Sequence, residues 1–279
     1  MAAFGGRGEG SPIAEAGAGV NDYPALTRLR IGCVKYLNAR PLIDRYAGPV
    51  EFAHPSELAV GMLENRLDAA LVPVFEGLRH NDYLLVDGVA IAADGPVYSV
   101  FLAYQGELAD VRTISLDPAS LTSVHLLQVL LAEYHGLHPE YRSAGEGQGI
   151  ADAQLLIGNQ AIAFRAQAPD GTRYLDLAEE WKRCTGLPFV FALWLLRSDV
   201  PDGRAAAGEF RALGADGLQH LEEIITTERI HSAEFARKYL TEYIRFGFGE
   251  REKEAVQRFR ELLHKHGFIA EAASPLRIV

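Results

Sequence analysis

Three hydroxyl side chains, Ser120, Thr122 and Ser123, lie close together between an expected strand and an expected helix. The β-branched residues of 113–116 predict the strand, and leucines recur at helical spacing from Val124 onward. The first N–H groups of a helix point outward without partners, so hydroxyls at this position can help to hold a carboxylate. A single hydroxyl there is equally typical of a helix cap. The strand–turn–helix context favours half of a binding site for a small anion.

Polar residues also follow the first buried strand expected in the chain, 29–34. Tyr36 and Asn38 would project from the turn after this strand, although Asn38 is equally typical of a turn residue or a helix cap. Another buried strand, 69–74, ends at Pro73, which marks a further strand-to-loop corner. Both corners are therefore candidate parts of the same site.

Ser99 is the only small hydroxyl in 97–104, which we expect to be one long strand. A buried serine needs a hydrogen-bond partner, so Ser99 either bonds to the backbone or faces the cleft as a site residue. Gly158 and Asn159 follow the predicted strand 153–157. Glycine permits close approach of the backbone to a ligand, and Asn159 would either meet that ligand or cap the next helix.

The composition, with 48% hydrophobic and 23% charged residues, is ordinary for a soluble globular protein. A chain of 279 residues is long enough for two α/β domains or one large one. The formal net charge of −10, without a long run of lysine and arginine, argues against a nucleic-acid partner. An acidic protein can still bind an anion where backbone dipoles and hydroxyls are arranged for it.

The sequence predicts neither a membrane partner nor secretion. The longest apolar run, 187–196, has about half the length of a membrane span. Residues 1–22 are rich in glycine and alanine, and Glu9 and Glu15 stand where a signal peptide would need an apolar core. We therefore expect a cytoplasmic protein with a disordered N-terminal tail.

The cysteines and histidines do not predict a metal site. Cys33 and Cys184 have neither metal-ligand spacing nor the pattern of a disulfide framework. The nine histidines are scattered, with none in a tight HxxxH pair. We expect no metal and leave the oligomeric state open.

Strands and helices alternate along the chain, which is typical of a mostly parallel sheet covered by helices. Two long apolar strands, 97–104 and 189–195, bracket 107–186, and this arrangement predicts an inserted second α/β domain joined by two connections. Inside that insert, Asp176 and Glu179 are typical of a capping box at the start of a helix.

The pattern from 204 to 266 is helical throughout. The predicted units are therefore a disordered tail (1–27), a discontinuous first domain that includes these helices (28–104 plus 188–279), and an inserted second domain (105–187).

Six motifs between about Leu29 and Arg197 resemble, in order, those of a known enzyme family. They are YLNARPL (36–42), LDAALVPV (67–74), DGPVYSV (94–100), LDPASLTSV (116–124), LIG (156–158) and TGLPFVFA (185–192). On these motifs the chain resembles the menaquinone-biosynthesis family that includes chorismate dehydratase. One motif alone is unspecific, whereas six in order are specific.

The resemblance implies a two-domain α/β fold like that of type II periplasmic binding proteins, with hinge strands and a C-terminal helical segment. It also implies loss of water from chorismate to give 3-(1-carboxyvinyloxy)benzoate, the first step of the futalosine route to menaquinone, without a metal or redox cofactor. By position, Asn38 and Ser99 are implied at the reacting ring. Two residues depart from the family pattern: Leu121 stands where arginine is frequent, and Asn159 where aspartate is frequent.

Chorismate carries two carboxylates and a hydroxyl leaving group on a ring that becomes aromatic once water is lost. Neutral donors such as Asn38, Ser99 and Thr122 can stabilise the charge that develops. No Ser-His-Asp arrangement is evident, and Glu76 is expected to be a solvated carboxylate at a helix start. We therefore expect a carboxylate of the substrate itself to take the ring proton.

Two other functions fit the same fold, because fold alone does not fix function. One is a non-catalytic solute-binding protein for small anions. The other is the sister enzyme of the same pathway, which acts on a later, futalosine-derived intermediate.

Overall fold

The computed structural model describes residues 22–80, 82–116, 120–143, 151–270 and 275–279. Most of the expected tail lies outside these residues, but its last part is packed against the protein. Leu26 is fully buried in a short 3-10 helix, Leu26–Arg28. The Glu209 carboxylate accepts hydrogen bonds from the backbone N–H groups of Ala25 and Leu26. These bonds explain why residues 25–27 of the expected tail are packed against the rest of the protein.

Five strands form the first sheet, in the spatial order β2, β1, β3, β10, β4. β1 (Ile31–Cys33), β2 (Val50–Phe52) and β3 (Ala69–Pro73) are parallel, whereas β10 (Phe189–Arg197) is antiparallel to both β3 and β4 (Tyr83–Ala93). Every residue of β3 is buried, as its continuous apolar run predicts. The sheet is mixed rather than mostly parallel, because β10 enters it in the opposite direction.

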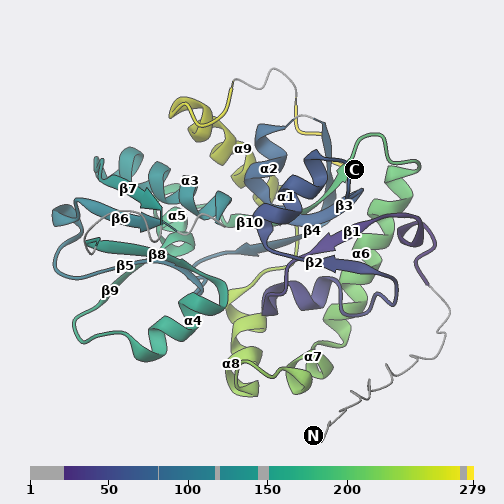
Figure 1. Ribbon diagram of the computed structural model, residues 1–279, viewed down its shortest axis with the longest axis horizontal. Helices are drawn as coiled ribbons and strands as arrows, with labels where there is room; N and C mark the ends of the chain where they lie inside the picture. The colour runs from purple at the N-terminus through teal and green to yellow at the C-terminus, as the bar shows by residue number, and fades with distance from the viewer. Residues whose placement is uncertain (1–21, 81, 117–119, 144–150, 271–274) are drawn as a thin grey trace, which may run out of the picture.

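The second sheet has the order β7, β6, β8, β5, β9. Here β6 (Thr113–Leu116) runs parallel to β7 (Glu140–Ser143) and β8 (Ala153–Ile157), and β5 (Val100–Tyr104) runs antiparallel to β8 and β9 (Arg173–Asp176). The two sheets lie side by side as two lobes (Figure 1). The sequence pattern predicts 100–104 in the first domain, but β5 pairs with β8 and β9 of the second sheet, so these residues belong to the second lobe.

The chain crosses between the sheets in two short segments, 94–99 and 186–188. We expected one long strand over 97–104, but the strand begins only at Val100. Pro96 has no N–H to give to a ladder, and Tyr98 has a left-handed φ of 68° that a strand cannot accommodate. Each named strand therefore belongs to one sheet, and the segments that connect the two lobes are irregular.

Nine α-helices lie in the described part of the chain and surround the two sheets. They are α1 (Pro55–Leu63), α2 (Val74–Arg79), α3 (Leu121–Leu130), α4 (Gly158–Gln167), α5 (Leu177–Thr185), α6 (Gly203–Gln219), α7 (Leu221–Thr227), α8 (Ala233–Lys238) and α9 (Glu250–Lys265). Short π-helical segments extend two of them, Leu131–His135 after α3 and Tyr239–Tyr243 after α8. α5 begins at the Asp176 cap and ends before Gly186, as the sequence predicts. None of the described helices combines the length and apolar content that crossing a membrane requires.

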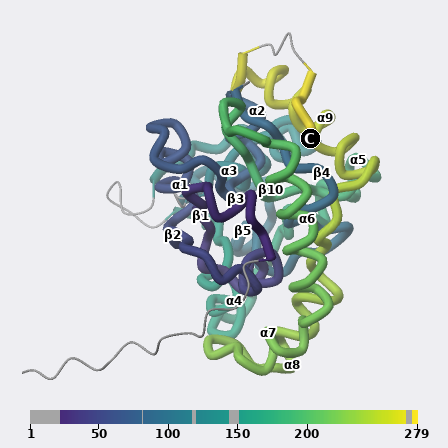
Figure 2. Tube along the Cα trace, turned by 90° about the vertical axis from the view of Figure 1, so that its right-hand side faces the viewer, coloured from purple at the N-terminus to yellow at the C-terminus, as the bar shows by residue number. Residues whose placement is uncertain are grey.

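The C-terminal segment packs mainly on the first lobe. Trp194 of β10 stacks on Phe210 of α6 with ring centroids 4.2 Å apart, and α6 runs beside β4 with α7 and α8 near its lower end (Figure 2). The backbone of Arg245 pairs with Ala92, and Ile278 pairs with Leu85, so later residues cover the free edge of β4. The helical segment is thereby held close to the junction of the lobes.

Candidate functional site

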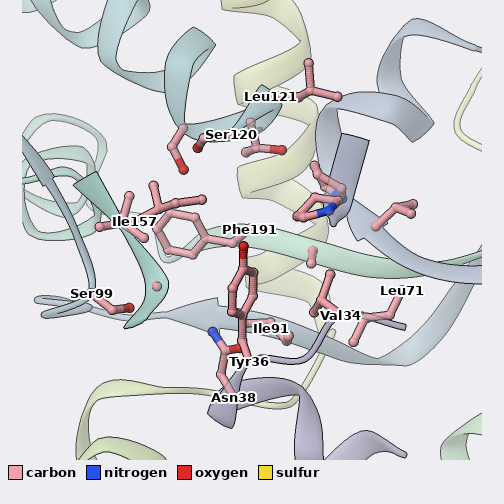
Figure 3. A pocket seen from close by; sticks show the side chains of 18 of the residues that line it. Val34, Tyr36, Asn38, Leu71, Ile91, Ser99, Ser120, Leu121, Ile157 and Phe191 are labelled. Carbon is pink, nitrogen blue, oxygen red and sulfur yellow. The ribbon is translucent and has the colours of Figure 1, made fainter. Parts of the chain in front are cut away.

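A cavity lies between the two lobes, at the ends of strands from both sheets. Its polar lining consists of Tyr36, Asn38, Ser99, Ser120, Thr122 and Ser123. Its other lining residues are Val34, Pro55, Leu71, Val72, Pro73, Ile91, Val97, Val100, Leu121, Ile157, Gly158, Phe191 and Ala192. Figure 3 shows Ser120 and Leu121 on one side, Asn38 on the opposite side, and Tyr36 reaching between them toward Phe191.

Eight of the nine residues that the sequence indicated line this one cavity: Tyr36, Asn38, Pro73, Ser99, Ser120, Thr122, Ser123 and Gly158. They converge because the carboxyl ends of β1 and β3, and those of β6 and β8, meet at facing edges of the two sheets. Asn159 lies outside this lining. Its side-chain oxygen is 3.2 Å from Nε2 of His231, in a neighbouring depression.

The three clustered hydroxyls stand at the start of α3. The helix begins at Leu121, three residues earlier than its leucine spacing suggested, so Ser120 occupies the cap position while Thr122 and Ser123 lie in the first turn. All three are at most 5% exposed. Ser120 makes no side-chain cap bond, and Thr122 Oγ1 accepts a hydrogen bond of 3.2 Å from the Phe75 backbone N–H. The hydroxyls therefore do not serve as ordinary caps of α3.

On the opposite side, Ser99 and Asn38 both contact Tyr239, which the sequence analysis did not single out. Tyr239 Oη lies 2.8 Å from Ser99 Oγ and 3.2 Å from Asn38 Nδ2. Burial raises the pKa of Tyr239 to about 12, so its phenol is protonated at neutral pH. Asn38 Oδ1 is buried without a hydrogen-bond partner among the described residues. No sequence signal distinguishes Tyr239 from any aromatic residue on the buried side of a helix.

Ser99 follows a strained turn. Its backbone N–H donates to the Val97 carbonyl at 2.8 Å across Tyr98, whose φ is 68°. A hydrogen bond from residue i+2 to i around a positive φ is characteristic of a γ-turn, which is rare and strained. Gly158 N–H in turn donates to the Ser99 carbonyl at 2.8 Å. This turn fixes the direction of the Ser99 side chain into the cavity.

The strained turn is held by groups of the second lobe and of the C-terminal segment. Asp176 accepts hydrogen bonds from the backbone N–H groups of both Val97 and Tyr98, in addition to capping α5. Burial raises the pKa of Asp176 above its ordinary value, although these N–H groups and Arg165 oppose that rise. The Arg165 guanidinium lies 4.3 Å from the centroid of the Tyr98 ring, and Tyr243 stacks on the same ring at 5.3 Å. Such contacts compensate the strain at Tyr98.

A glycine brings the second lobe close to Tyr36. Gly158 has a φ of 58°, and a Cβ built on it would approach the Tyr36 ring to 3.3 Å. Both the backbone conformation and the contact favour glycine. Tyr36 from the first lobe therefore packs directly on the junction of β8 and α4 in the second.

The described lining of the cavity carries no aspartate, glutamate, histidine, lysine, arginine or cysteine. No group of three or more such metal-binding side chains (His, Cys, Asp, Glu) comes together anywhere in the described ranges. The expectation for Glu76 was wrong: this residue is 1% exposed and pairs with Arg79 at 2.9 Å, because α2 turns its first-turn carboxylate inward. Burial raises the pKa of Glu76, and the residue does not line the cavity. The described lining of the cavity is thus neutral, and what it offers to a ligand is hydrogen bonds and dipoles.

Comparison with known proteins gives consistent matches over most of the chain. A chorismate dehydratase of Thermus thermophilus is 34% identical over 219 residues, which cover 71% of this chain and 80% of the relative. A chorismate dehydratase of Campylobacter jejuni is 27% identical over 240 residues, which cover 85% and 93%. A solved Candida albicans protein, described as having the generic periplasmic binding protein structural fold, is 12% identical, covers 88% of this chain and 91% of its own, and has a TM-score of 0.59.

These matches agree with the architecture of two lobes that each carry a mixed five-stranded sheet, which is the fold of periplasmic binding proteins. Residues 29–265 match the model of the family described as "Menaquinone biosynthesis", so nearly all of the described chain is covered. The chain therefore belongs to the menaquinone biosynthesis family.

Proposed function

We propose that this chain is a chorismate dehydratase, a hydro-lyase of menaquinone biosynthesis. The observation that carries the proposal is its similarity to two chorismate dehydratases over 71% and 85% of its length. The cavity supports the same conclusion, because six neutral polar side chains and an apolar wall suit a small ring with polar substituents.

The start of α3 is the proposed binding site of a substrate carboxylate. Ser120, Thr122 and Ser123 are directed there together with the free N–H groups of the first turn. A helix N-terminus carries a partial positive charge, which favours an anion even in a protein of net charge −10. Because Leu121 supplies no cation, the hydroxyls and N–H groups carry the whole interaction.

The ring is proposed to lie between this turn and the pair Asn38 and Ser99, with Tyr36, Pro73 and Gly158 shaping its pocket. In the reaction the ring loses a hydroxyl group and a hydrogen from the adjacent carbon, and the product 3-(1-carboxyvinyloxy)benzoate is aromatic. The described lining offers no side chain able to take the ring proton. We assign that step to a substrate carboxylate, which then passes the proton to the departing hydroxide to give water. Asn38 and Ser99 orient the ring and hold its leaving hydroxyl group by hydrogen bonds.

Closure of the lobes over the substrate is part of the proposal. The two connections, 94–99 and 186–188, are short and irregular, as hinge segments often are. The two sheets would then move as separate units, with the cavity between them. Small-angle scattering should show compaction when chorismate is added to the Ser99→Ala variant, which binds but turns over slowly. An unchanged profile would indicate a rigid, preclosed cleft.

The proposed activity is tested by incubating chorismate with a catalytic amount of the purified protein and following both compounds by mass spectrometry. We expect a product lighter than chorismate by one water and formed in many molar equivalents. Tight binding without product would favour a solute-binding protein instead. Conversion of a futalosine-derived intermediate but not of chorismate would indicate the sister enzyme. As part of the proposal we assign the enzyme to the cytoplasm, because its relatives catalyse a biosynthetic step on a small metabolite; cell fractionation checks this assignment.

A further inference from the structure

Tyr239 lies directly behind the two residues proposed at the reacting ring, without lining the cavity itself. It belongs to the π-helical turn Tyr239–Tyr243 that follows α8, and it is only 2% exposed. Its hydroxyl contacts both Asn38, which belongs to the first lobe, and Ser99, which lies in the connection between the lobes. Inserted π-turns of this kind occur frequently at functional sites.

The hydrogen bonds around Tyr239 have only one consistent direction. A phenol hydroxyl has one proton to donate, whereas an amide nitrogen such as Asn38 Nδ2 can only donate. Tyr239 Oη therefore accepts from Asn38, and its own proton must go to another acceptor. Among the described residues, Ser99 Oγ is the other partner of this hydroxyl. Because a buried donor requires an acceptor, Tyr239 donates to Ser99.

This direction determines what Ser99 and Asn38 offer to a ligand. Since Ser99 Oγ accepts the hydrogen bond that Tyr239 donates, its own O–H is left to point into the cavity that it lines. Since Asn38 Nδ2 is engaged by Tyr239, its buried Oδ1 is left as an acceptor without a partner. One donor and one acceptor thus stand together on the same side of the cavity.

We infer that Tyr239 is a positioning residue that sets Ser99 as a donor and Asn38 as an acceptor, so that together they bind the hydroxyl group lost from the substrate. This inference rests on the proposed function. Asn38 Oδ1 accepts the hydrogen of that hydroxyl, and Ser99 donates to its oxygen, where negative charge grows as the carbon–oxygen bond breaks. Hydrogen bonds in a chain polarise one another, so donation from Asn38 to Tyr239 and from Tyr239 to Ser99 strengthens the last donor. Ser99 keeps its proton throughout.

The test is Tyr239→Phe, which removes one oxygen atom and leaves the ring in place. We expect kcat for chorismate to fall by about 10- to 100-fold, the usual effect of losing a group that orients a functional side chain, with KM changed less than about 3-fold. The matched control is Tyr46→Phe, because the Tyr46 hydroxyl is also buried but has no hydrogen-bond partner among the described residues and lies outside the cavity. This control should keep the wild-type kcat.

A double variant separates positioning from a general structural effect. If Tyr239 acts through Ser99, adding Tyr239→Phe to Ser99→Ala should slow the enzyme by no more than about 3-fold beyond Ser99→Ala alone. The inference would be overturned if the effects of the two substitutions on kcat were fully additive, or if Tyr239→Phe alone kept the wild-type kcat. Should circular dichroism show that Tyr239→Phe is unfolded, 3-fluorotyrosine placed at position 239 keeps the shape and makes a stronger donor. An increase of kcat would then support the inference, and an unchanged kcat would overturn it.

The same experiments separate the inference from the proposed function. If the wild-type protein does not convert chorismate, the proposed function fails. If it does convert chorismate and Ser99→Ala is slow while Tyr239→Phe is fast, only the role of Tyr239 fails.

Discussion

The Tyr98 backbone N–H donates a 2.8 Å hydrogen bond to the Asp176 carboxylate, which links the turn before Ser99 to the start of α5. The same carboxylate also accepts from Val97, Ala178 and Glu179. It is 6% exposed, so water does not replace these bonds if they are lost. The position of Ser99 therefore depends on a residue that the sequence identifies only as a helix cap.

Asp176→Asn should impair both stability and activity. Asparagine keeps one acceptor oxygen but turns an NH2 group toward N–H donors that the carboxylate now satisfies. We expect a loss of about 1–3 kcal/mol in the free energy of unfolding, as for other buried groups left without a partner. We also expect kcat to fall, because the strained turn at Tyr98 loses its anchor. Denaturant unfolding and steady-state kinetics measure the two effects.

Asp152→Asn is the matched control for this prediction. Asp152 also accepts hydrogen bonds from two backbone N–H groups, those of Arg112 and Thr113, but it is exposed. It precedes the amino end of β8, whereas the cavity lies at the carboxyl end of this strand. This variant should keep the wild-type kcat. Equal losses of activity in the two variants would refute a specific role of Asp176 in holding Ser99.

Two variants separate the contribution of Ser120, Thr122 and Ser123 to substrate binding from their contribution to the stability of the fold. Ser120 and Ser123 make no hydrogen bond to other described residues through their hydroxyls, whereas Thr122 Oγ1 accepts from the Phe75 N–H. Ser120→Ala/Ser123→Ala should therefore weaken chorismate binding with little change in melting temperature. The expected loss is about 1.5–3 kcal/mol per charge-assisted hydrogen bond, or roughly 10- to 150-fold in affinity.

Thr122→Val should lower affinity and melting temperature together, because it also leaves the Phe75 N–H without its acceptor. Calorimetric titration and thermal melts on both variants give the comparison. If the double serine variant bound chorismate with unchanged affinity, the hydroxyl groups at the start of α3 would have only a structural role.

Glu180 should make stability depend on pH on the acidic side. Arg183, together with His135, whose Nε2 lies 2.7 Å from Oε1, holds the pKa of this buried carboxyl below its ordinary value of 4.5. A pKa that is lower in the folded state stabilises the protein above the ordinary pKa, and this stabilisation disappears as the pH falls through the folded-state value. The melting temperature of Glu180→Gln should therefore lie below that of the wild type at pH 7, and the gap should narrow on acidification below about 4.5.

The exposed neighbour Glu179, which makes no side-chain ion pair within the described residues, offers the control for this pH series. Glu179→Gln should leave the wild-type pH dependence nearly intact. A constant gap between wild type and Glu180→Gln at all pH values would show that Glu180 contributes by packing rather than by charge.

Much of the architecture follows from local pattern in the sequence. Apolar runs and turn residues predicted the strands that end near Tyr36, Pro73, Ser120 and Gly158, and parallel pairing brings strand ends to one edge. For that reason the predicted site residues, apart from Asn159, line one cavity.

What the sequence did not reveal depends on contacts between distant segments. Tyr239 lies 140 residues from Ser99 along the chain, and only the packing of the π-turn after α8 brings them together. The positive φ of Tyr98 is also invisible in the sequence, because tyrosine is not a residue that favours this conformation. The sequence predicted a solvated Glu76, whereas the residue is buried. The local pattern could not show this, because tertiary packing fixes which side of the short helix α2 faces inward.

The turnover of chorismate by the wild-type protein and by Asn38→Ala, measured side by side with product identified by mass, tests the central claim most directly. The account predicts one molecule of 3-(1-carboxyvinyloxy)benzoate for each chorismate consumed by the wild type. For a folded Asn38→Ala variant it predicts a kcat lower by about 10²–10³, comparable with the loss of one hydrogen-bonding group directed at the reacting atoms. A folded wild-type protein that leaves chorismate unchanged would contradict the account, and so would an Asn38→Ala variant with near-normal kcat, since Asn38 would then be only a turn residue.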